Sequence, residues 1–305
     1  MTSRKESAEL SPGQPTRLSR SRRANNPPTM RLMPHDLEIL SAVAEYRILR
    51  QDQIQTLFFG SKSTAQYRLS HLYQHGFLNR HFLPVQGGWS PTLYTIDTRG
   101  REVLRVEFGD AAPTEKTGIR DLKQEFLEHT LALNDVRIAF SLACRAPGLT
   151  LTTWLDEATL KVNYDRVAIR YPNGKRATIS LIPDSYCVIQ TLQGAARFFI
   201  ELDRGTMTTQ RFASKILAYL AYVESGQYQQ QYKSRSLRVL TIALSAKRLV
   251  HLKHATEQVG GTHLFWFAML SDVIQRAILS EPFWWVAGND SASPLVSPLS
   301  GMTKP

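Results

Sequence analysis

The sequence predicts a mixed α+β chain with two folded parts, a small helical part that ends in a β-hairpin and a larger α/β part. Three observations support this class. Apolar residues recur at helical spacing between 35 and 75, two β-prone runs separated by Gly and Pro follow, and a long amphipathic helix beyond 120 precedes alternating strands and helices. A chain of 305 residues with 43% hydrophobic residues is long enough to bury two cores.

Charge indicates the class of partner. The chain carries 37 Lys and Arg against 26 Asp and Glu, a net charge of +11, and its pI is near 9.8. Such a surface favours a polyanion, either nucleic acid or an anionic membrane. No apolar run of about 18 residues could span a bilayer and the N-terminus lacks a secretory apolar core, so we expect a cytoplasmic protein without a membrane partner. Cys144 and Cys187 are isolated, which argues against a zinc knuckle or a disulfide framework.

Residues 1–31 are expected to form a disordered basic arm. They hold seven Lys or Arg against two Glu, among Ser, Pro, Asn and Thr with few large apolar residues. The arm is either a solvated tail or a segment that contacts phosphates, and a transit peptide would need an amphipathic helix that is missing. The candidate phosphate contacts are Arg20, Arg22 and Arg23.

Residues 32–112 are predicted to form a winged helix-turn-helix domain. The expected elements are helices at 35–46, 51–58, 62–75 and 98–107, and strands at 77–83 and 93–96. The short connection at 59–61 contains Gly60, as the turn between two such helices often does. Three helices followed by a β-hairpin make a winged helix.

The third helix of this domain is the candidate DNA reader. Its first turns and the face away from Leu69 and Leu72 are polar or basic, so they are suited to phosphates and base edges in a major groove. The candidate residues are Lys62, Ser63, Thr64, Gln66, Tyr67 and Arg68, with Arg80 on the wing. A domain used for protein contacts, or a merely solvated face, would show a similar pattern.

Residues 118–286 are expected to form the α/β domain, after a linker near 110–118, and residues 287–305 a flexible tail. The expected elements are helices at 120–144 and 208–223, strands at 149–155, 177–190, 196–202 and 237–244, one or two strands between 158 and 171, and a final helix and strand.

Three carboxylates stand at the ends of two of these strands. If Gln193 and Gly194 form the hairpin turn, Asp184 faces the pair Leu202 and Asp203 and lies diagonal to Glu201. Such a cluster needs a cation, and Mg²⁺ or Mn²⁺ prefers oxygen ligands. Neutralising side chains are available in Lys215, Arg204 and Arg211. In the alternative interpretation there is no metal site, and the acids are only the polar ends of two strands followed by a plain turn.

Together these stretches resemble a known family. Pro183-Asp184 on one strand and Glu201-Leu202-Asp203 on the next are similar to the PD-(D/E)xK, or restriction-endonuclease-like, nucleases. Combined with DLEIL at 36–40, LFFGS at 57–61 and TAQYRL at 64–69, the pattern resembles the replication-relaxation family of mobile-element proteins, which is similar to MOBC-type conjugative relaxases.

The resemblance implies roles for individual residues. Asp184 and Glu201 correspond to metal-binding acids, and the carbonyl of Leu202 to a further metal ligand. The lysine of the motif is replaced by Asp203, so the resemblance implies either that Lys215 supplies the catalytic charge or that the site is inactive.

Two functions follow. The first is a metal-dependent nickase or relaxase that acts on double-stranded DNA at a transfer or replication origin, with Mg²⁺ or Mn²⁺. The alternative is a non-catalytic regulator of plasmid replication or transcription, whose degenerate nuclease-like domain binds other plasmid-processing proteins or forms a homodimer. A relaxase with a tyrosine nucleophile is disfavoured, because His251 and His254 have HxxH spacing rather than the HxH of its metal motif.

Overall fold

The computed structural model describes residues 22–82, 90–109, 124–171 and 173–296. The chain divides into two compact units, Met1–Arg120 and Asp121–Pro305, which are described separately. Within the described ranges, no helix is long and apolar enough to cross a membrane. The expected linker at 110–118 and residues 83–89, between the two strands of the expected hairpin, lie outside these ranges.

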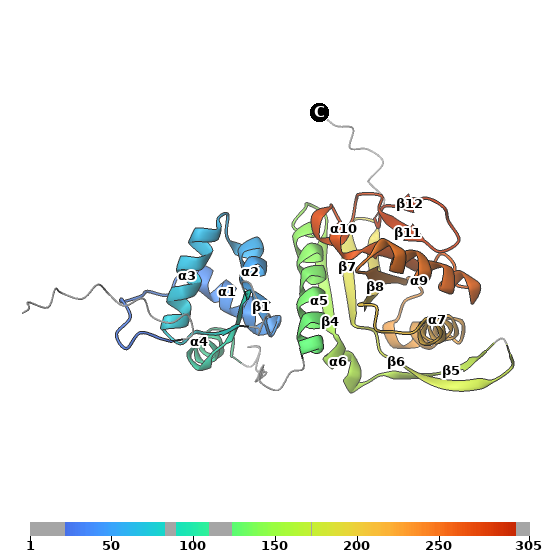
Figure 1. The fold of residues 1–305 in the computed structure, drawn as a ribbon, viewed down its shortest axis with the longest axis horizontal. Coiled ribbons are helices and arrows are strands. Elements are labelled where there is room, and N and C mark those ends of the chain that lie inside the picture. Colours follow the sequence, from blue (N-terminus) through green and yellow to red (C-terminus); the bar gives the residue numbers. More distant parts are fainter. Residues whose placement is uncertain (1–21, 83–89, 110–123, 172, 297–305) are drawn as a thin grey trace, which may run out of the picture. The chain divides into compact units, whose positions relative to one another are not determined.

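The N-terminal unit combines four helices with a small antiparallel sheet (Figure 1). Its helices are α1 (Pro34–Glu45), α2 (Gln51–Phe58), α3 (Lys62–Gln74) and α4 (Thr98–Phe108). The strands are β1 (Leu49–Arg50), β2 (Leu78–Phe82) and β3 (Thr92–Ile96), in the order β1-β3-β2. The four expected helices and the hairpin are confirmed, whereas the two-residue strand β1 was not expected.

Local signals set the bounds of these helices. Pro34 occupies the first turn of α1, where its missing N–H costs nothing. The Ser61 hydroxyl accepts the backbone N–H of Thr64 and caps α3. A Cβ on Gly100 would lie 2.3 Å from the carbonyl oxygen of Phe77, so only glycine lets α4 pack this closely.

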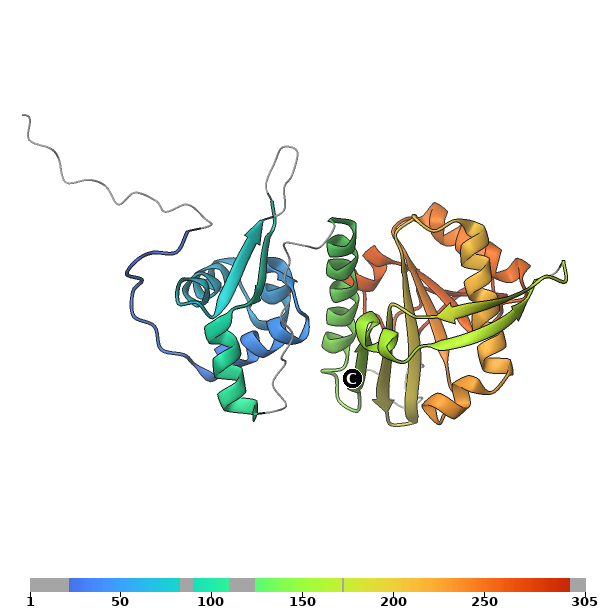
Figure 2. The same cartoon turned by 90° about the horizontal axis from the view of Figure 1, so that it is seen from below.

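The C-terminal unit is a mixed sheet with helices on both faces (Figures 1 and 2). Its strands run β12-β11-β10-β9-β8-β7-β4, and β8, β9 and β10 are parallel to one another. The strand bounds are β4 (Thr150–Asp156), β7 (Ser185–Thr191), β8 (Gly194–Asp203), β9 (Arg238–Ala243), β10 (Phe265–Met269), β11 (Trp284–Val286) and β12 (Ala292–Ser293).

Two apolar clusters hold the layers together. One joins the sheet to α7 (Thr209–Glu224) and α9 (Ala246–Gln258), and the other joins it to α5 (Gln124–Ala143) and α10 (Leu270–Gln275). Alternation along β8 serves both clusters, since Phe199 faces the first while Phe198 and Ile200 face the second. The short helices are α6 (Glu157–Val162) and α8 (Gln227–Tyr232).

One expectation about the strands was confirmed and one was wrong. Of the one or two strands expected between 158 and 171, β5 (Asp165–Arg170) is present, but the unexpected helix α6 precedes it, capped by Asp156, which accepts the N–H of Thr159. The expected strand at 177–190 is two strands in different sheets, β7 and β6 (Arg176–Leu181), and β6 forms a two-stranded sheet with β5. Pro183 interrupts the run, because proline has no N–H to donate to a ladder.

The β7–β8 hairpin also differs from the expected register. Ser185 pairs with Ile200 and Thr191 with Gly194, so Leu192 and Gln193 form the turn instead of Gln193 and Gly194. The expected register was therefore wrong by two residues. Continued by one residue, the observed register brings Asp184 beside Glu201 rather than Asp203.

Part of the expected flexible tail is folded, so the prediction was wrong for residues 287–296. Residues 287–296 belong to the folded unit, because β12 pairs with β11 and Leu295 is fully buried. Arg238 donates to the Leu295 carbonyl and fixes this end of the chain on the sheet. The remaining residues of the predicted tail, 297–305, lie outside the described ranges.

Candidate active site and nucleic-acid interface

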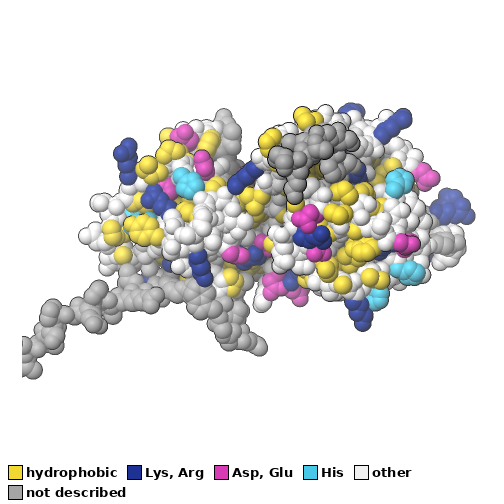
Figure 3. Space-filling view, turned by 90° about the horizontal axis from the view of Figure 1, so that it is seen from above, with side chains coloured by type: hydrophobic (Ala, Val, Ile, Leu, Met, Phe, Trp, Pro, Cys, Tyr) yellow, Lys and Arg dark blue, Asp and Glu magenta, His cyan; other side chains and the backbone are white. Residues whose placement is uncertain are grey.

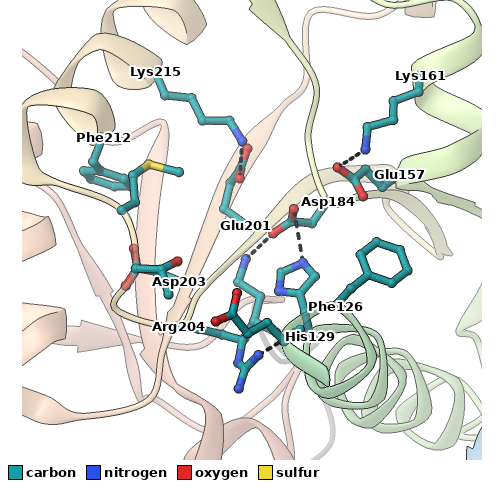
Figure 4. A pocket seen from close by; sticks show the side chains of 14 residues that line it. Phe126, His129, Glu157, Lys161, Asp184, Glu201, Asp203, Arg204, Phe212 and Lys215 are labelled. Atoms are coloured by element: carbon teal, nitrogen blue, oxygen red, sulfur yellow. Dashed lines mark hydrogen bonds and ion pairs between the residues drawn. The ribbon is translucent and has the colours of Figure 1, made fainter. Parts of the chain in front are cut away.

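A pocket of about 400 Å³ lies in the C-terminal unit, where β8 ends and β7 begins (Figure 4). Side chains of α5, α6, α7 and the β7–β8 hairpin line it. They are Glu125, Phe126, His129, Glu157, Lys161, Asp184, Glu201, Leu202, Asp203, Arg204, Thr206, Met207, Phe212 and Lys215.

Asp184 is fixed by its own hairpin and by α5. Its N–H donates to Ile200 O at 3.1 Å, and its Oδ2 accepts the Leu202 N–H at 2.7 Å. His129 Nε2 lies 3.4 Å from Oδ1. Burial alone would raise the pKa of Asp184, but the His129 hydrogen bond and the charge of Lys215 outweigh it, so this pKa lies below its ordinary value.

Sequence reasoning missed His129. Burial lowers its pKa, and the hydrogen bond and charge of Asp184 more than offset that effect, so the pKa of His129 is raised. The available signal was the group of polar residues Glu125, Glu128 and His129 in the first turns of a helix whose later turns carry most of its buried apolar side chains. Such polar residues face either solvent or a site, and only the fold shows that His129 faces Asp184.

Glu201 is held by two residues of α7. Its Oε2 lies 2.5 Å from Lys215 Nζ, and its Oε1 accepts a hydrogen bond from the Tyr219 hydroxyl. Lys215 also donates to Ile182 O at 3.1 Å. Burial raises the pKa of Glu201 to about 7, although the charge of Lys215 acts in the opposite direction. Burial lowers the pKa of Lys215, but Glu201 and Asp184 reverse this and raise it.

Asp203 has a different partner. Arg248 of α9 donates to both of its oxygens at 2.8 Å and to Met207 O at 2.7 Å. Oδ1 also accepts the Gly205 N–H at 2.8 Å. Asp203 is therefore a buried acid with its own bidentate cation, which sequence reasoning missed because Arg248 is 45 residues away along the chain.

The other two expected neutralising residues, Arg204 and Arg211, do not pair with Asp184, Glu201 or Asp203 in the described structure. Arg204 pairs with Glu128 and donates to Glu125 O at 2.7 Å, and Arg211 is exposed on α7. In the parts of the chain that the structure describes, no group of three or more His, Cys, Asp and Glu side chains is arranged to hold a metal ion. A bound cation would therefore rest on two carboxylates completed by carbonyl, water or phosphate oxygens.

Three arginines expected to contact DNA have partners inside the N-terminal unit. Arg68 pairs with the buried Asp36, with 2.5 Å between Nε and Oδ1, and donates to Arg31 O. Arg80 stacks over the ring of Tyr73 at 4.4 Å. In the free protein both side chains therefore have intramolecular partners, and their contact with DNA stays a prediction.

The third of these arginines belongs to the expected basic arm. Arg23 donates to Tyr73 O at 2.8 Å and lies 2.6 Å from Asp97 Oδ2, so this part of the arm is anchored on the folded unit. Arg22 is exposed, and Arg20 lies outside the described residues.

The remaining candidates form an exposed polar row along α3. Lys62, Ser63, Thr64, Gln66 and Tyr67 are all exposed, and the Tyr67 ring packs on His71 with centroids 4.5 Å apart. The buried face of α3 carries Ala65, Leu69 and Leu72. The first turns of the helix therefore present polar side chains to solvent while its other face is fixed in the core.

These features define a class of protein, an α+β chain whose N-terminal unit is mainly helical and whose C-terminal unit is a mixed sheet that holds an acidic pocket with a partly buried lysine. The chain belongs to the Replication-relaxation family, whose sequence model matches residues 40–236.

Among solved structures, the restriction endonuclease FokI is distantly similar, at 10% identity and a TM-score of 0.27. The similarity covers 79% of this chain and 42% of FokI, so the chain spans less than half of that protein. A comparison with curated proteins finds no significant match.

Proposed function

We propose that the protein binds DNA of a plasmid or other mobile element and nicks it, with a divalent metal ion, at a transfer or replication origin. In this proposal the N-terminal unit is a winged helix-turn-helix domain and the C-terminal unit a restriction-endonuclease-like domain. Membership of the Replication-relaxation family supports a role on the DNA of a plasmid or other mobile element. The observation that carries the chemistry is the meeting of Asp184, Glu201 and Lys215 in one pocket.

Recognition of double-stranded DNA is assigned to α3. Lys62 supplies a phosphate contact, and Ser63, Thr64, Gln66 and Tyr67 supply hydrogen-bonding groups of the kinds that contact base edges and phosphates. Arg68 contributes indirectly, since its pair with Asp36 ties α3 to α1. The net charge of +11 favours encounter with a polyanion.

The pocket residues fit Mg²⁺ or Mn²⁺ as an incomplete set of hard ligands. Asp184 and Glu201 supply carboxylate oxygens and Leu202 a carbonyl, and Mg²⁺ typically keeps several waters or substrate phosphates beside one or two carboxylates. Each carboxylate oxygen already accepts a hydrogen bond or faces a cation, but it retains a second lone pair for a metal ion.

When bound, such an ion activates water and offsets negative charge on the phosphate. The chain's own residues orient the site. Lys215 and Tyr219 each hold one oxygen of Glu201, and the Leu202 N–H and His129 hold the two oxygens of Asp184. The cation of Lys215 is the only basic group in contact with Glu201 in the described structure, and it is suited to stabilising charge on a phosphate bound beside it.

One observation favours a second function, a DNA-binding regulator without catalysis. The position where the nuclease motif has lysine is occupied by Asp203, which Arg248 holds in a bidentate pair. In this alternative the α/β unit serves as a platform for a second copy or for other plasmid-processing proteins.

A supercoiled-plasmid nicking assay decides between the two functions. Plasmid carrying the cognate origin is incubated with Mg²⁺ or Mn²⁺ and with wild type, Asp184→Asn or Glu201→Gln. The nickase proposal predicts open-circular product from wild type and a loss of at least about 100-fold in each variant. The exposed Glu281→Gln serves as the matched control and should retain activity. Equal activity in all four proteins would remove the pocket from the reaction.

A further inference from the structure

The two-stranded ribbon formed by β5 and β6 has one strongly basic face. Along each strand, exposed and buried residues alternate, so the two faces differ sharply. The inner face packs on α7 through Val167, Ile169 and Leu181. The exposed members of the outer face are Arg166, Ala168, Arg170, Arg176, Thr178 and Ser180.

Among the described residues of β5 and β6, the exposed outer face carries no acidic side chain. The one carboxylate within the two strands, Asp165, accepts a hydrogen bond from the Tyr222 hydroxyl of α7. Among described residues, no ion pair with a carboxylate involves Arg166, Arg170 or Arg176. Figure 3 shows Lys and Arg side chains (dark blue) at the end of the larger unit where the ribbon projects.

The cross-strand register places two of these cations together. Arg170 pairs directly with Arg176, and Lys175 lies in the adjoining turn. Like charges directly opposite each other destabilise a sheet, so this pair costs stability in the free protein. A bound polyanion would offset this repulsion, because its negative charge lies between the two cations and each guanidinium can donate two parallel hydrogen bonds to a phosphate.

The ribbon also leads into the pocket. The end of β6 continues through Ile182, whose carbonyl accepts from Lys215, to Asp184. The start of β5 follows α6, whose Glu157 and Lys161 line the pocket. The Arg166–Ser180 pair is therefore near the pocket end of the ribbon, and the Arg170–Arg176 pair is near its far end. The two pairs are four residues apart along the strand, which corresponds to about 13 Å.

We propose that this outer face is a second DNA-binding surface, which binds the phosphodiester backbone and leads it toward the pocket. This inference rests on DNA being the partner of the proposed function, but it does not depend on cleavage. The small side chains of Ala168, Thr178 and Ser180 let the backbone come close to the ribbon. A two-stranded ribbon fits the major groove of DNA. A membrane is a poorer fit, because among the described residues of β5 and β6 no large apolar side chain is exposed on the outer face; the exposed Val162 and Tyr164 precede β5, at the end of the ribbon near the pocket.

The test measures affinity for a fluorescent duplex over a range of salt, in EDTA so that no cleavage occurs. The ribbon variant is Arg166→Gln/Arg170→Gln/Arg176→Gln. Its matched control, Arg145→Gln/Arg235→Gln/Lys247→Gln, removes the same charge from other exposed positions of the same unit. We expect the ribbon variant to lose at least about tenfold in affinity and to lower the salt slope by about 2–3, while the control stays within about twofold of wild type.

A photocrosslinking amino acid at Thr178 gives a readout that does not depend on affinity. Crosslinking to DNA there, and not at the exposed His251 of α9, is the expected result. An unchanged salt slope in the ribbon variant, or an equal change in the control, would overturn the inference, as would binding of phosphatidylserine vesicles in place of DNA. Lys62→Gln/Gln66→Ala, measured in parallel, tests α3. If the α3 variant binds DNA with wild-type affinity while the ribbon variant binds more weakly, α3 is rejected as the DNA reader and the ribbon is retained as a DNA-binding surface.

Discussion

Replacing Lys215 by Met removes the cation that faces Glu201 without greatly changing side-chain volume. The pair is largely buried, with exposed side-chain fractions of 19% for Lys215 and 9% for Glu201. Breaking such a pair by removing one partner costs about 3–5 kcal/mol when the other must stay charged. Glu201 has an alternative that avoids this cost, because it can retain a proton and stay neutral.

This alternative makes the cost depend on pH. A carboxyl whose folded pKa is raised from 4.5 to about 7 stabilises the folded state fully below pH 4.5, and this contribution is lost as the pH rises through 7. Without Lys215 the pKa of Glu201 rises further, since the lysine charge lowers it. The loss of stability then continues above pH 7 in the variant but not in wild type. The difference between them should widen by about 1.4 kcal/mol per pH unit.

Urea denaturation of the full chain at pH 6, 7, 8 and 9 measures this difference. Tryptophan fluorescence is a suitable probe, because four of the five tryptophans lie in the C-terminal unit. Lys161→Met is the control, since its partner Glu157 is on the same helix and the pair is more exposed, so a change below about 1 kcal/mol at every pH is expected. A pH-independent difference for Lys215→Met would refute the assigned coupling between the two side chains.

Three further predictions concern single contacts. Arg68→Ala leaves the buried Asp36 without its cation and should destabilise the N-terminal unit by about 3–5 kcal/mol, seen as a lower thermal midpoint by circular dichroism; an unchanged midpoint would contradict the pairing. Tyr219→Phe removes a charge-assisted hydrogen bond to Glu201 and should cost about 1.5–3 kcal/mol in urea denaturation, and a neutral effect would show that the hydroxyl is dispensable. Lys62→Gln should weaken duplex binding and lower the salt slope by about 1, whereas an unchanged slope would argue that α3 does not contact phosphate.

Local signals predicted much of the fold. The apolar spacing of Leu69 and Leu72 and the turn at Gly60 were sufficient to place α2 and α3 within one residue. Local signals failed for elements whose secondary structure depends on contacts with distant parts of the chain. A short strand such as β1 has too few residues to show a period, and the helix α6 depends on its cap at Asp156 more than on an apolar pattern.

The candidate site was predicted less completely. The acids and Lys215 are close in sequence, separated by one hairpin, a short loop and about two helical turns, so the spacing could bring them together. Their other partners come from distant elements. His129 lies 55 residues before Asp184 on α5, and Arg248 lies on α9. No local pattern links such residues, which is why Asp203 was grouped with the other acids and not with its arginine.

The nickase proposal requires Asp184 and Glu201 to hold a divalent metal ion together, which a metal-binding measurement can detect in the protein alone. Titration of the full chain with Mn²⁺, followed by the electron paramagnetic resonance of the free ion, counts bound ions without requiring a DNA target. We expect one Mn²⁺ site in wild type and in the control Glu281→Gln, and loss of that site in Asp184→Asn and in Glu201→Gln. Identical binding curves for wild type and these two variants would contradict it.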